Sequence, residues 1–198
     1  MFVTFEGVDW SGKSTQAELL AAWLREEGRR VVATREPGGT PLAEGVRDLV
    51  LHGHDMSAWA EAALYAAARA DHAAHVIRPA LGRGEDVVCD RYLDSSVAYQ
   101  GVARGLGEER VRDLSLIVTE RLLPDRTFFV SVDPDEALQR ATGDHDRIER
   151  EGAEFMRRVD AGYRALAAAE PERIVTVDGS RAPEEIAEEV REHVRPLL

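Results

Sequence analysis

The sequence predicts an α/β protein of three layers, in which helices cover both faces of a five-stranded parallel sheet. Five short apolar segments rich in β-branched residues alternate with long segments of helical periodicity, which is the pattern of parallel strands joined by crossover helices. The length of 198 residues favours one domain, residues 1–198, with a core that needs no disulfide or structural metal. No change in composition marks a linker between two domains.

The first predicted strand, residues 2–5, leads into a match to the phosphate-loop pattern G-x-x-x-x-G-K-[ST], and a helix predicted over residues 16–27 follows. The glycines let backbone N–H groups turn toward an anion, and the helix N-terminus adds about half a positive charge. This context predicts a nucleoside triphosphate site that comprises Gly7, Val8, Asp9, Trp10, Ser11, Gly12, Lys13, Ser14 and Thr15.

Lys13, inside this loop, is the only lysine among the 25 lysines and arginines of the chain. A compact ammonium on a flexible stem can follow a moving phosphoryl group, whereas a guanidinium is a planar and bulkier fork. The chain uses arginine for nearly all of its positive charge and makes an exception where phosphate chemistry favours lysine. We therefore expect Lys13 to contact the phosphates of a donor nucleotide.

The remaining elements are predicted from the same two patterns. Short β-branched runs predict strands over residues 31–33, 87–89, 127–132 and 174–177. Helical periodicity predicts helices over residues 57–81, 108–122, 134–141, 147–169 and 183–194. In the last helix Ile186, Val190 and Val194 recur one turn apart after Pro183, a residue favoured in the first helical turn.

Polar segments follow the predicted strands, at the edge of the sheet where open α/β folds bind ligands. The phosphate loop follows the first strand, residues 35–40 follow the second, residues 90–92 follow the third and Asp133 follows the fourth. The two middle segments bring two arginines and two glycines to one crevice. This grouping suits a second anion beside the nucleotide.

The composition excludes several classes of protein. A formal net charge of −12 argues against binding to a nucleic-acid polymer, which requires many phosphates to be neutralised. The chain has no asparagine, so it lacks the Asn-Lys-x-Asp motif of Ras-type GTPases and the catalytic-loop asparagine of protein kinases.

The lone Cys89, in an apolar run, is expected to be a buried thiol. With no long apolar segment and no basic leader, we expect a cytoplasmic protein without membrane contact.

Two histidine pairs, His52 with His54 and His72 with His75, have spacings that occur in metal sites. Neither pair has a nearby set of carboxylates or thiols that would complete four ligands. We therefore expect these histidines to be ordinary surface or packing residues.

At this point the chain resembles the thymidylate kinase family. Six segments in the same order carry the resemblance, over residues 2 to about 150. They are Phe5-Glu6-Gly7-Val8-Asp9 with the phosphate loop, Arg35-Glu36-Pro37-Gly38-Gly39-Thr40, Tyr65-Ala66-Ala67-Ala68-Arg69, Asp90-Arg91-Tyr92, Ser95-Ser96-Val97-Ala98-Tyr99-Gln100-Gly101, and Asp146-Arg147-Ile148-Glu149. Apart from the phosphate loop, any one of these alone would be a weak signal.

The resemblance implies a P-loop kinase fold with a short lid, about residues 141–150, that moves the γ-phosphoryl group of ATP onto dTMP to give dTDP and ADP. It implies Mg²⁺ as cofactor and a homodimer. Two alternatives stay open on the residues alone. One is a P-loop kinase for another nucleoside monophosphate, a deoxynucleoside or a metabolite hydroxyl, and the other is a nucleotide-binding switch without an acceptor.

For the acceptor site, the resemblance implies a thymine stacked on Tyr65 with Arg69 donating to a base carbonyl. These two residues lie one helical turn apart and share a face, although a solvent-facing Tyr-Arg pair would show the same spacing. Tyr99 would fill the 2′ side of the sugar, or it could belong to the core. The implied substrate-binding residues are Asp9, Glu36, Pro37, Tyr65, Arg69, Arg91, Ser96, Tyr99 and Gln100.

For the reaction itself, the resemblance implies that Arg91 grips the dTMP phosphate and that Asp90 holds the magnesium shell beside Ser14; a structural ion pair after the third strand is the alternative. Asp9 would lie near the acceptor's sugar and phosphate. The loop carries Trp10 and no base other than Lys13, which implies that a lid arginine reaches the γ-phosphate. The predicted catalytic residues are thus Lys13, Arg91, Asp9 and Arg147.

The lid departs from the family pattern because it is short and acidic. Only Arg140, Arg147 and Arg150 flank it, and we expect Arg147 to be the residue that closes over the γ-phosphate. Arg150 could equally be a solvated helix residue. Arg47, weighed as a further phosphate contact, could instead lie on the surface of an amphipathic helix. The resemblance also implies a rigid turn at Pro37, although most X-Pro bonds are trans.

Overall fold

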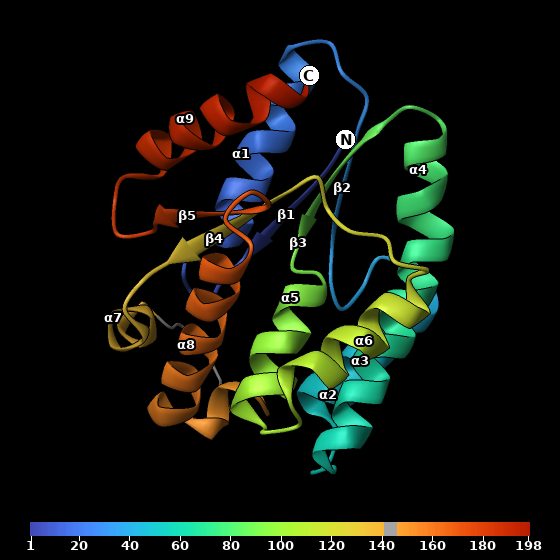
Figure 1. Cartoon of the computed structure of the whole chain (residues 1–198), viewed down its shortest axis with the longest axis vertical. Coiled ribbons are helices and arrows are strands. Elements are labelled where there is room, and N and C mark those ends of the chain that lie inside the picture. Colours follow the sequence, from blue (N-terminus) through green and yellow to red (C-terminus); the bar gives the residue numbers. More distant parts are fainter. Residues whose placement is uncertain (141–145) are drawn as a thin grey trace.

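The computed structural model describes residues 1–140 and 146–198 and contains one sheet of five parallel strands (Figure 1). The strands are β1 (Phe2–Glu6), β2 (Val31–Arg35), β3 (Asp86–Asp90), β4 (Arg126–Ser131) and β5 (Ile174–Asp178), in the spatial order β2-β3-β1-β4-β5. The predicted five-stranded parallel sheet is therefore confirmed. Because β1 is central and pairs with β3 and β4, the segments that follow these three strands meet at one edge.

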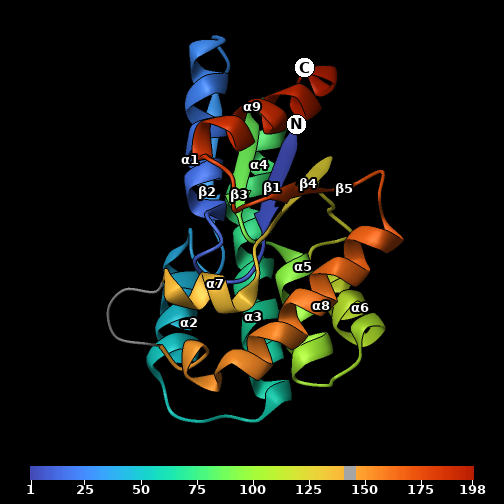
Figure 2. The same ribbon diagram turned by 90° about the vertical axis from the view of Figure 1, so that its left-hand side faces the viewer.

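Two apolar clusters, one on each face of the sheet, form the core. Side chains alternate along β1: Phe2 joins one cluster, while Val3 and Phe5 join the other. Helices α1 (Lys13–Glu26) and α9 (Pro183–Val194) cover the face of Val3 and Phe5, and they lie together beside the sheet in Figures 1 and 2. Helix α8 (Ala153–Ala169) and the segment of residues 93–103 cover the opposite face.

The other helices lie beyond the carboxyl ends of the strands or along the second face (Figure 2). They are α2 (Pro41–His52), α3 (Ala58–His72), α4 (Arg78–Gly82), α5 (Leu93–Ser96), α6 (Glu108–Val118) and α7 (Pro134–Gln139). Two π-helical turns, Ala73–Ile77 and Val97–Ala103, extend α3 and α5, and short 3₁₀ turns span Glu149–Glu151 and Arg195–Leu197. None of the described helices is long and apolar enough to cross a membrane.

The structure differs from the predicted helices in several places. Helix α2 was not predicted; it begins after Thr40, whose hydroxyl accepts a hydrogen bond from the backbone N–H of Ala43 at 3.1 Å. Residues 57–81 were predicted as one helix, but α3 is followed by a π turn and then by α4. The π turn lies just before Pro79, a residue that cannot donate an amide hydrogen bond. The predicted helix over residues 147–169 begins at Ala153, because Gly152 has a φ of 85° and interrupts it.

Two further backbone features lie beside the pocket described below. The Glu36–Pro37 peptide bond is cis. Arg91, directly after β3, has a φ of 69°, and Trp10 in the phosphate loop has a φ of 66°. Non-glycine residues adopt this region uncommonly and mostly where surrounding contacts hold them there.

Glu6, the last residue of β1, is a buried carboxylate that ties three segments together. Its Oε1 accepts from the backbone N–H of Tyr92 at 2.8 Å, and its Oε2 accepts from the hydroxyls of Ser95 at 2.6 Å and Tyr163 at 3.0 Å. Burial, with the charge of Asp94 adding to it, outweighs these hydrogen bonds and raises the pKa of Glu6 to about 7.

This raised pKa predicts how stability depends on pH. Between about pH 4.5 and pH 7 the folded chain holds a proton on Glu6 that the unfolded chain releases, so the contribution of Glu6 to the free energy of unfolding is present below pH 4.5 and is lost as the pH rises through 7. In Glu6→Gln this loss, which is about 1.4 kcal/mol for each unit of pKa shift, disappears. Urea unfolding at pH 5 and pH 8 measures it.

The control for this experiment is Glu154→Gln, which changes an exposed carboxylate on α8. We expect Glu154→Gln to keep the pH dependence of the wild type. Equal pH dependence in Glu6→Gln and the wild type would contradict the assignment of a raised pKa to Glu6.

Candidate active site

The phosphate loop connects β1 to α1 and includes Lys13, the only lysine in the chain. Lys13 is 6% exposed, and its ammonium donates to the carbonyl of Val8 at 3.2 Å and lies 3.5 Å from Asp9 Oδ1. Burial and the nearby Arg91 guanidinium lower the pKa of Lys13, while Asp9 opposes the change. At Gly7, with a φ of 148°, a Cβ would lie 2.7 Å from the carbonyl oxygen of Val130, so the loop can approach β4 only with glycine there.

Ser14 and Asp90 meet where α1 begins beside the end of β3. The Ser14 hydroxyl donates to Asp90 Oδ2 at 2.5 Å, and Asp90 Oδ1 is buried without a hydrogen-bond partner among the described residues. A hydroxyl and a carboxylate with a free oxygen are the hard ligands that Mg²⁺ prefers. The donor set therefore fits the predicted magnesium site.

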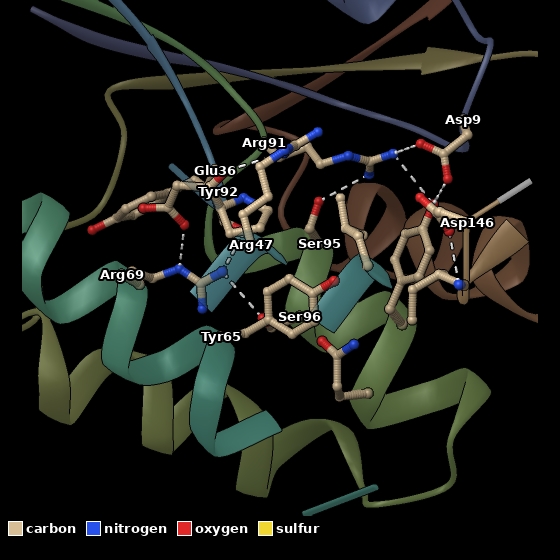
Figure 3. A pocket seen from close by; sticks show the side chains of 15 residues that line it. Asp9, Glu36, Arg47, Tyr65, Arg69, Arg91, Tyr92, Ser95, Ser96 and Asp146 are labelled. Carbon is tan, nitrogen blue, oxygen red and sulfur yellow. Dashed lines mark hydrogen bonds and ion pairs between the residues drawn. The ribbon is translucent and has the colours of Figure 1, made fainter. Parts of the chain in front are cut away.

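A pocket of about 560 Å³, counting its open mouth, lies next to the loop (Figure 3). All nine predicted substrate-binding residues line it. They are Asp9, Glu36, Pro37, Tyr65, Arg69, Arg91, Ser96, Tyr99 and Gln100.

Arg91 lies between the phosphate loop and this pocket. Its guanidinium donates to the Gly7 carbonyl at 2.9 Å and to the hydroxyls of Ser95 and Tyr163, both at 3.2 Å, and it pairs with Asp9. The same group lies 5.2 Å from the centre of the Tyr99 ring. Figure 3 shows Arg91 and Asp9 at one end of the pocket, opposite Arg69 and Tyr65. A planar donor fork in this position can bind a phosphate bidentately.

Asp9 is the acid inside the phosphate loop. Burial alone would raise its pKa, but the Arg91 guanidinium and the Lys13 ammonium hold the pKa of Asp9 well below its usual range. The hydroxyl of Tyr99 also donates to Asp9 Oδ2 at 3.2 Å. Asp9 is therefore charged at neutral pH and balances the two cations that flank it.

At the far end of the pocket, Arg69 is 2% exposed and held on several sides. It donates to Glu36 Oε2 at 2.8 Å, to the Tyr92 carbonyl at 3.0 Å, and to the hydroxyls of Ser96 and Ser115, both at 3.1 Å. These contacts use four of the five N–H groups of a guanidinium, which leaves one for a ligand.

The predicted histidine pairs do not form metal sites in the described structure. His72 is buried: its Nδ1 lies 2.9 Å from Glu36 Oε1, and its Nε2 lies 2.8 Å from the hydroxyl of Thr34. Nowhere in residues 1–140 and 146–198 do three histidine, cysteine or acidic side chains group as metal ligands. His72 instead helps to fix Glu36, which in turn fixes Arg69.

Tyr99 is packed like a core residue and also lines the pocket. It is 6% exposed and packs edge to face on Phe155 at 6.1 Å and Tyr163 at 6.4 Å, yet its hydroxyl reaches Asp9 and it lines the pocket. Tyr65 lies on α3 one turn from Arg69, and both line the pocket, as their spacing predicted.

Part of the predicted lid, residues 141–145, lies outside the described residues. Arg147 is 7% exposed, and its guanidinium donates to the Val50 carbonyl and to Glu61 Oε2, at 2.8 and 2.7 Å. These contacts attach the segment to α2 and α3. The geometry gives no support to the prediction that Arg147 reaches the γ-phosphate.

The two other predicted lid arginines are more exposed. Arg140, at the end of α7, donates to the carbonyl of Gly179 at 3.2 Å and pairs with Glu136 at 2.6 Å. Gly179 in turn packs against the phosphate loop, since a Cβ on Gly179 would lie 2.9 Å from the carbonyl oxygen of Ser11. Arg140 therefore contacts a residue that itself contacts the loop. Arg150 is exposed in the short turn before α8.

The structure adds residues that the sequence did not single out. Tyr92 and Ser95 belong to two of the six segments that carry the family resemblance, and this was the only indication in the sequence that they line the pocket. Leu51, on the unpredicted α2, could not be found from the sequence. Arg47, which was weighed as a phosphate contact, lines the pocket and donates to the Pro37 carbonyl at 3.1 Å. The remaining lining residues are Asp146 and Ile148.

Comparison with known proteins agrees with the geometry. Residues 5–190 match the model of the family described as "Thymidylate kinase". The chain is 55% identical to the thymidylate kinase of Leifsonia xyli over 195 residues, which cover 96% of this chain and 92% of the relative. It is 48% identical to that of a Synechococcus strain over 198 residues, which cover 100% of this chain and 96% of the relative.

A solved structure gives the same result. The crystal structure of thymidylate kinase from Ehrlichia chaffeensis matches with a TM-score of 0.81 and 34% identity, over 98% of each chain. A fold match at this identity over the whole length, with a family match that spans both the phosphate loop and the pocket, leads to one conclusion. The chain belongs to the thymidylate kinase family.

Proposed function

We propose that this protein transfers the γ-phosphoryl group of ATP to dTMP, giving dTDP and ADP. The observation that carries the proposal is a single pocket with an anion-binding arginine, Arg91, beside the phosphate loop and an aromatic and guanidinium pair, Tyr65 and Arg69, at its other end. A nucleoside monophosphate has its phosphate and its base at the same two ends. A nucleotide-binding switch has no need of this second pocket.

Lys13 and the backbone N–H groups of the loop hold the β- and γ-phosphates of ATP in this scheme. Ser14 and Asp90 would hold Mg²⁺, which would neutralise negative charge on the phosphates when it is bound. The free Asp90 Oδ1 supports this assignment.

Arg91 would grip the phosphate of dTMP. Because Arg91 also donates to the carbonyl of Gly7, it holds the acceptor directly beside the loop that holds the donor. Phosphoryl transfer needs two anions brought into line and positive charge spread over the moving oxygens. The attacking oxygen belongs to a phosphate that is already anionic, so no strong general base is required.

At the base end, Tyr65 would stack on thymine while the remaining N–H of Arg69 donates to a carbonyl of the ring. Tyr99, fixed by Asp9 and by two aromatic neighbours, would occupy the 2′ side of the sugar. Crowding alone rejects an added hydroxyl by only about a hundredfold. The site therefore favours deoxynucleotides through a rigid tyrosine without excluding ribonucleotides completely.

For the lid, we propose Arg140 as the cation nearest the donor. It contacts the Gly179 loop that packs on the phosphate loop, whereas Arg147 is held by Val50 and Glu61. Arg147 then anchors the end of the lid. We also propose a cytoplasmic location, which the free buried thiol of Cys89 supports.

The function is tested by coupled turnover with ATP, Mg²⁺ and each nucleoside monophosphate in turn. We expect dTMP to be phosphorylated with the highest kcat/KM, ahead of dCMP and dGMP. A preference for another nucleoside monophosphate would change the proposed substrate but not the proposed type of reaction. ATP hydrolysis that no acceptor accelerates would refute the kinase assignment.

Arg69→Ala tests the base end separately. Arg69 lies at the end of the pocket opposite Arg91 and Asp9 (Figure 3), so its loss would remove a base contact and leave a buried Glu36 without its guanidinium partner. We expect the KM for dTMP to rise by about tenfold or more while the KM for ATP stays within about twofold. Similar increases for both substrates would contradict the placement of dTMP in this pocket.

A homodimer is proposed from exposed apolar side chains on three neighbouring helices, α2, α3 and α6 (Figure 1). Four large side chains there are 46–74% exposed: Leu42, Leu49, Trp59 and Ile117. Such patches mark interfaces. Sedimentation equilibrium is expected to give twice the chain mass of 21.9 kDa, and Ile117→Arg is expected to shift it toward the monomer. A monomeric wild type at micromolar concentration would refute the dimer.

A further inference from the structure

Glu61 is a buried carboxylate behind the base end of the pocket. It lies on α3, one turn before Tyr65 and two turns before Arg69, so the three side chains share one helix face. Glu61 is only 1% exposed and does not line the pocket itself. Its position is therefore one layer behind the residues that would contact the base.

Glu61 accepts hydrogen bonds from side chains of two distant segments. Its Oε1 accepts from the amide nitrogen of Gln100 at 2.9 Å and from Arg104 Nε at 3.2 Å. Its Oε2 accepts from Arg104 at 3.1 Å and from Arg147 at 2.7 Å. Together the three donors outweigh burial and hold the pKa of Glu61 below its usual range.

A carboxylate shared by two guanidinium groups is ionised and can only accept hydrogen bonds. The side of the Gln100 amide that faces Glu61 must therefore be the NH₂ group. The opposite orientation would place the Gln100 carbonyl oxygen against a buried negative charge and leave both without a donor. The charge of Glu61 thus fixes which end of Gln100 faces the pocket.

The end that faces away from Glu61 is the oxygen, Oε1. Gln100 lines the pocket, and among the described residues no side chain or backbone group donates to this oxygen. Gln100 is 2% exposed, so the little surface that it keeps is at the pocket that it lines. The pocket therefore presents a hydrogen-bond acceptor at this position.

Thymine and uracil carry an N–H donor at N3, whereas cytosine carries an acceptor there and an amino group beside it. An acceptor on Gln100 suits the first two bases and opposes the third. We propose that Glu61 is a specificity-determining positioning residue, which selects bases with an N3–H by fixing the amide of Gln100. This inference rests on the proposed function, and it assigns to Glu61 the enzyme's preference among bases.

Glu61→Gln is the test. Its carbonyl oxygen would replace Oε2 and keep the contacts with Arg147 and Arg104 Nη2, while its NH₂ would face Gln100 and Arg104 Nε, which would lose its acceptor. Gln100 would then turn its oxygen toward residue 61 and its NH₂ into the pocket. We expect the ratio of kcat/KM for dTMP to that for dCMP to fall by about tenfold. Arg69 keeps its own contact with the base, so the ratio falls without inverting.

The acceptor dUMP provides an internal control because uracil has the same N3–H as thymine. We expect the ratio of dTMP to dUMP to stay within about twofold of the wild-type value in Glu61→Gln, with the change confined to dCMP. Ratios measured on one preparation cancel any loss of folded enzyme, so a purely structural role for Glu61 would leave all of them unchanged. An unchanged ratio of dTMP to dCMP overturns the inference, and so does a changed ratio of dTMP to dUMP, which would indicate a deformed pocket.

The matched control is Glu151→Gln. Glu151 pairs with the same arginine, Arg104, at 2.5 Å but does not contact Gln100. The Glu151→Gln variant removes a carboxylate from the same network. We expect it to leave the ratio of kcat/KM for dTMP to that for dCMP at the wild-type value. A fall in this control equal to that in Glu61→Gln would show that the loss of any carboxylate from the network changes the ratio without a contact to Gln100, and would overturn the inference.

If Glu61→Gln leaves too much unbalanced positive charge to fold, the double variant Glu61→Gln with Arg104→Leu removes one cation and keeps apolar contact with the Phe155 ring, which lies 4.7 Å from the Arg104 guanidinium. The single variant Arg104→Leu retains Glu61 and is expected to keep the ratio of dTMP to dCMP. The double variant is expected to lower it by about tenfold, and equal ratios in the two would overturn the inference. Failure of the wild type to phosphorylate dTMP at all would instead refute the proposed function.

Discussion

The ion pair between Arg91 and Asp9 is the interaction on which the site depends. It joins the end of β3 to the phosphate loop after β1, two segments that a parallel sheet brings to the same edge. Arg91 reaches this position with a φ of 69°, and Gly7, Ser95 and Tyr163 hold its guanidinium there. In the proposed function, a cation fixed in this way would lie between the two phosphates that must meet, and its position is set by protein contacts alone.

Three buried or half-buried carboxylates organise the positive charge around the pocket. Asp9 holds Arg91, Glu36 holds Arg69, and Glu61 holds Arg147 and Arg104. Each pair is costly to desolvate, yet removing one partner would cost more because a buried charge would remain alone. A chain of net charge −12 can thus bind two anionic nucleotides, because its arginines are directed locally while the surface stays acidic.

The sequence predicted the sheet from short local patterns, and it predicted the nine pocket residues through the resemblance of its motifs to those of a known family. A β-branched run specifies a buried parallel strand, and motif residues directly after strands must meet at the carboxyl edge. It did not predict α2, whose buried residues are only Ala43, Val46 and Val50. Nor could it show the contacts that Arg147 makes, since the partners of that side chain, Val50 and Glu61, lie 97 and 86 residues away in the chain.

The single lysine has a consequence for the chemistry of the whole molecule. With 24 arginines and one lysine, the chain presents only one ε-amine to any reagent or enzyme that modifies amines, and this amine is 6% exposed inside the phosphate loop. Acylating dyes, amine cross-linkers and lysine-directed modification therefore have no harmless surface lysine to react with. Any ε-amine adduct on this protein reports directly on access to the nucleotide site.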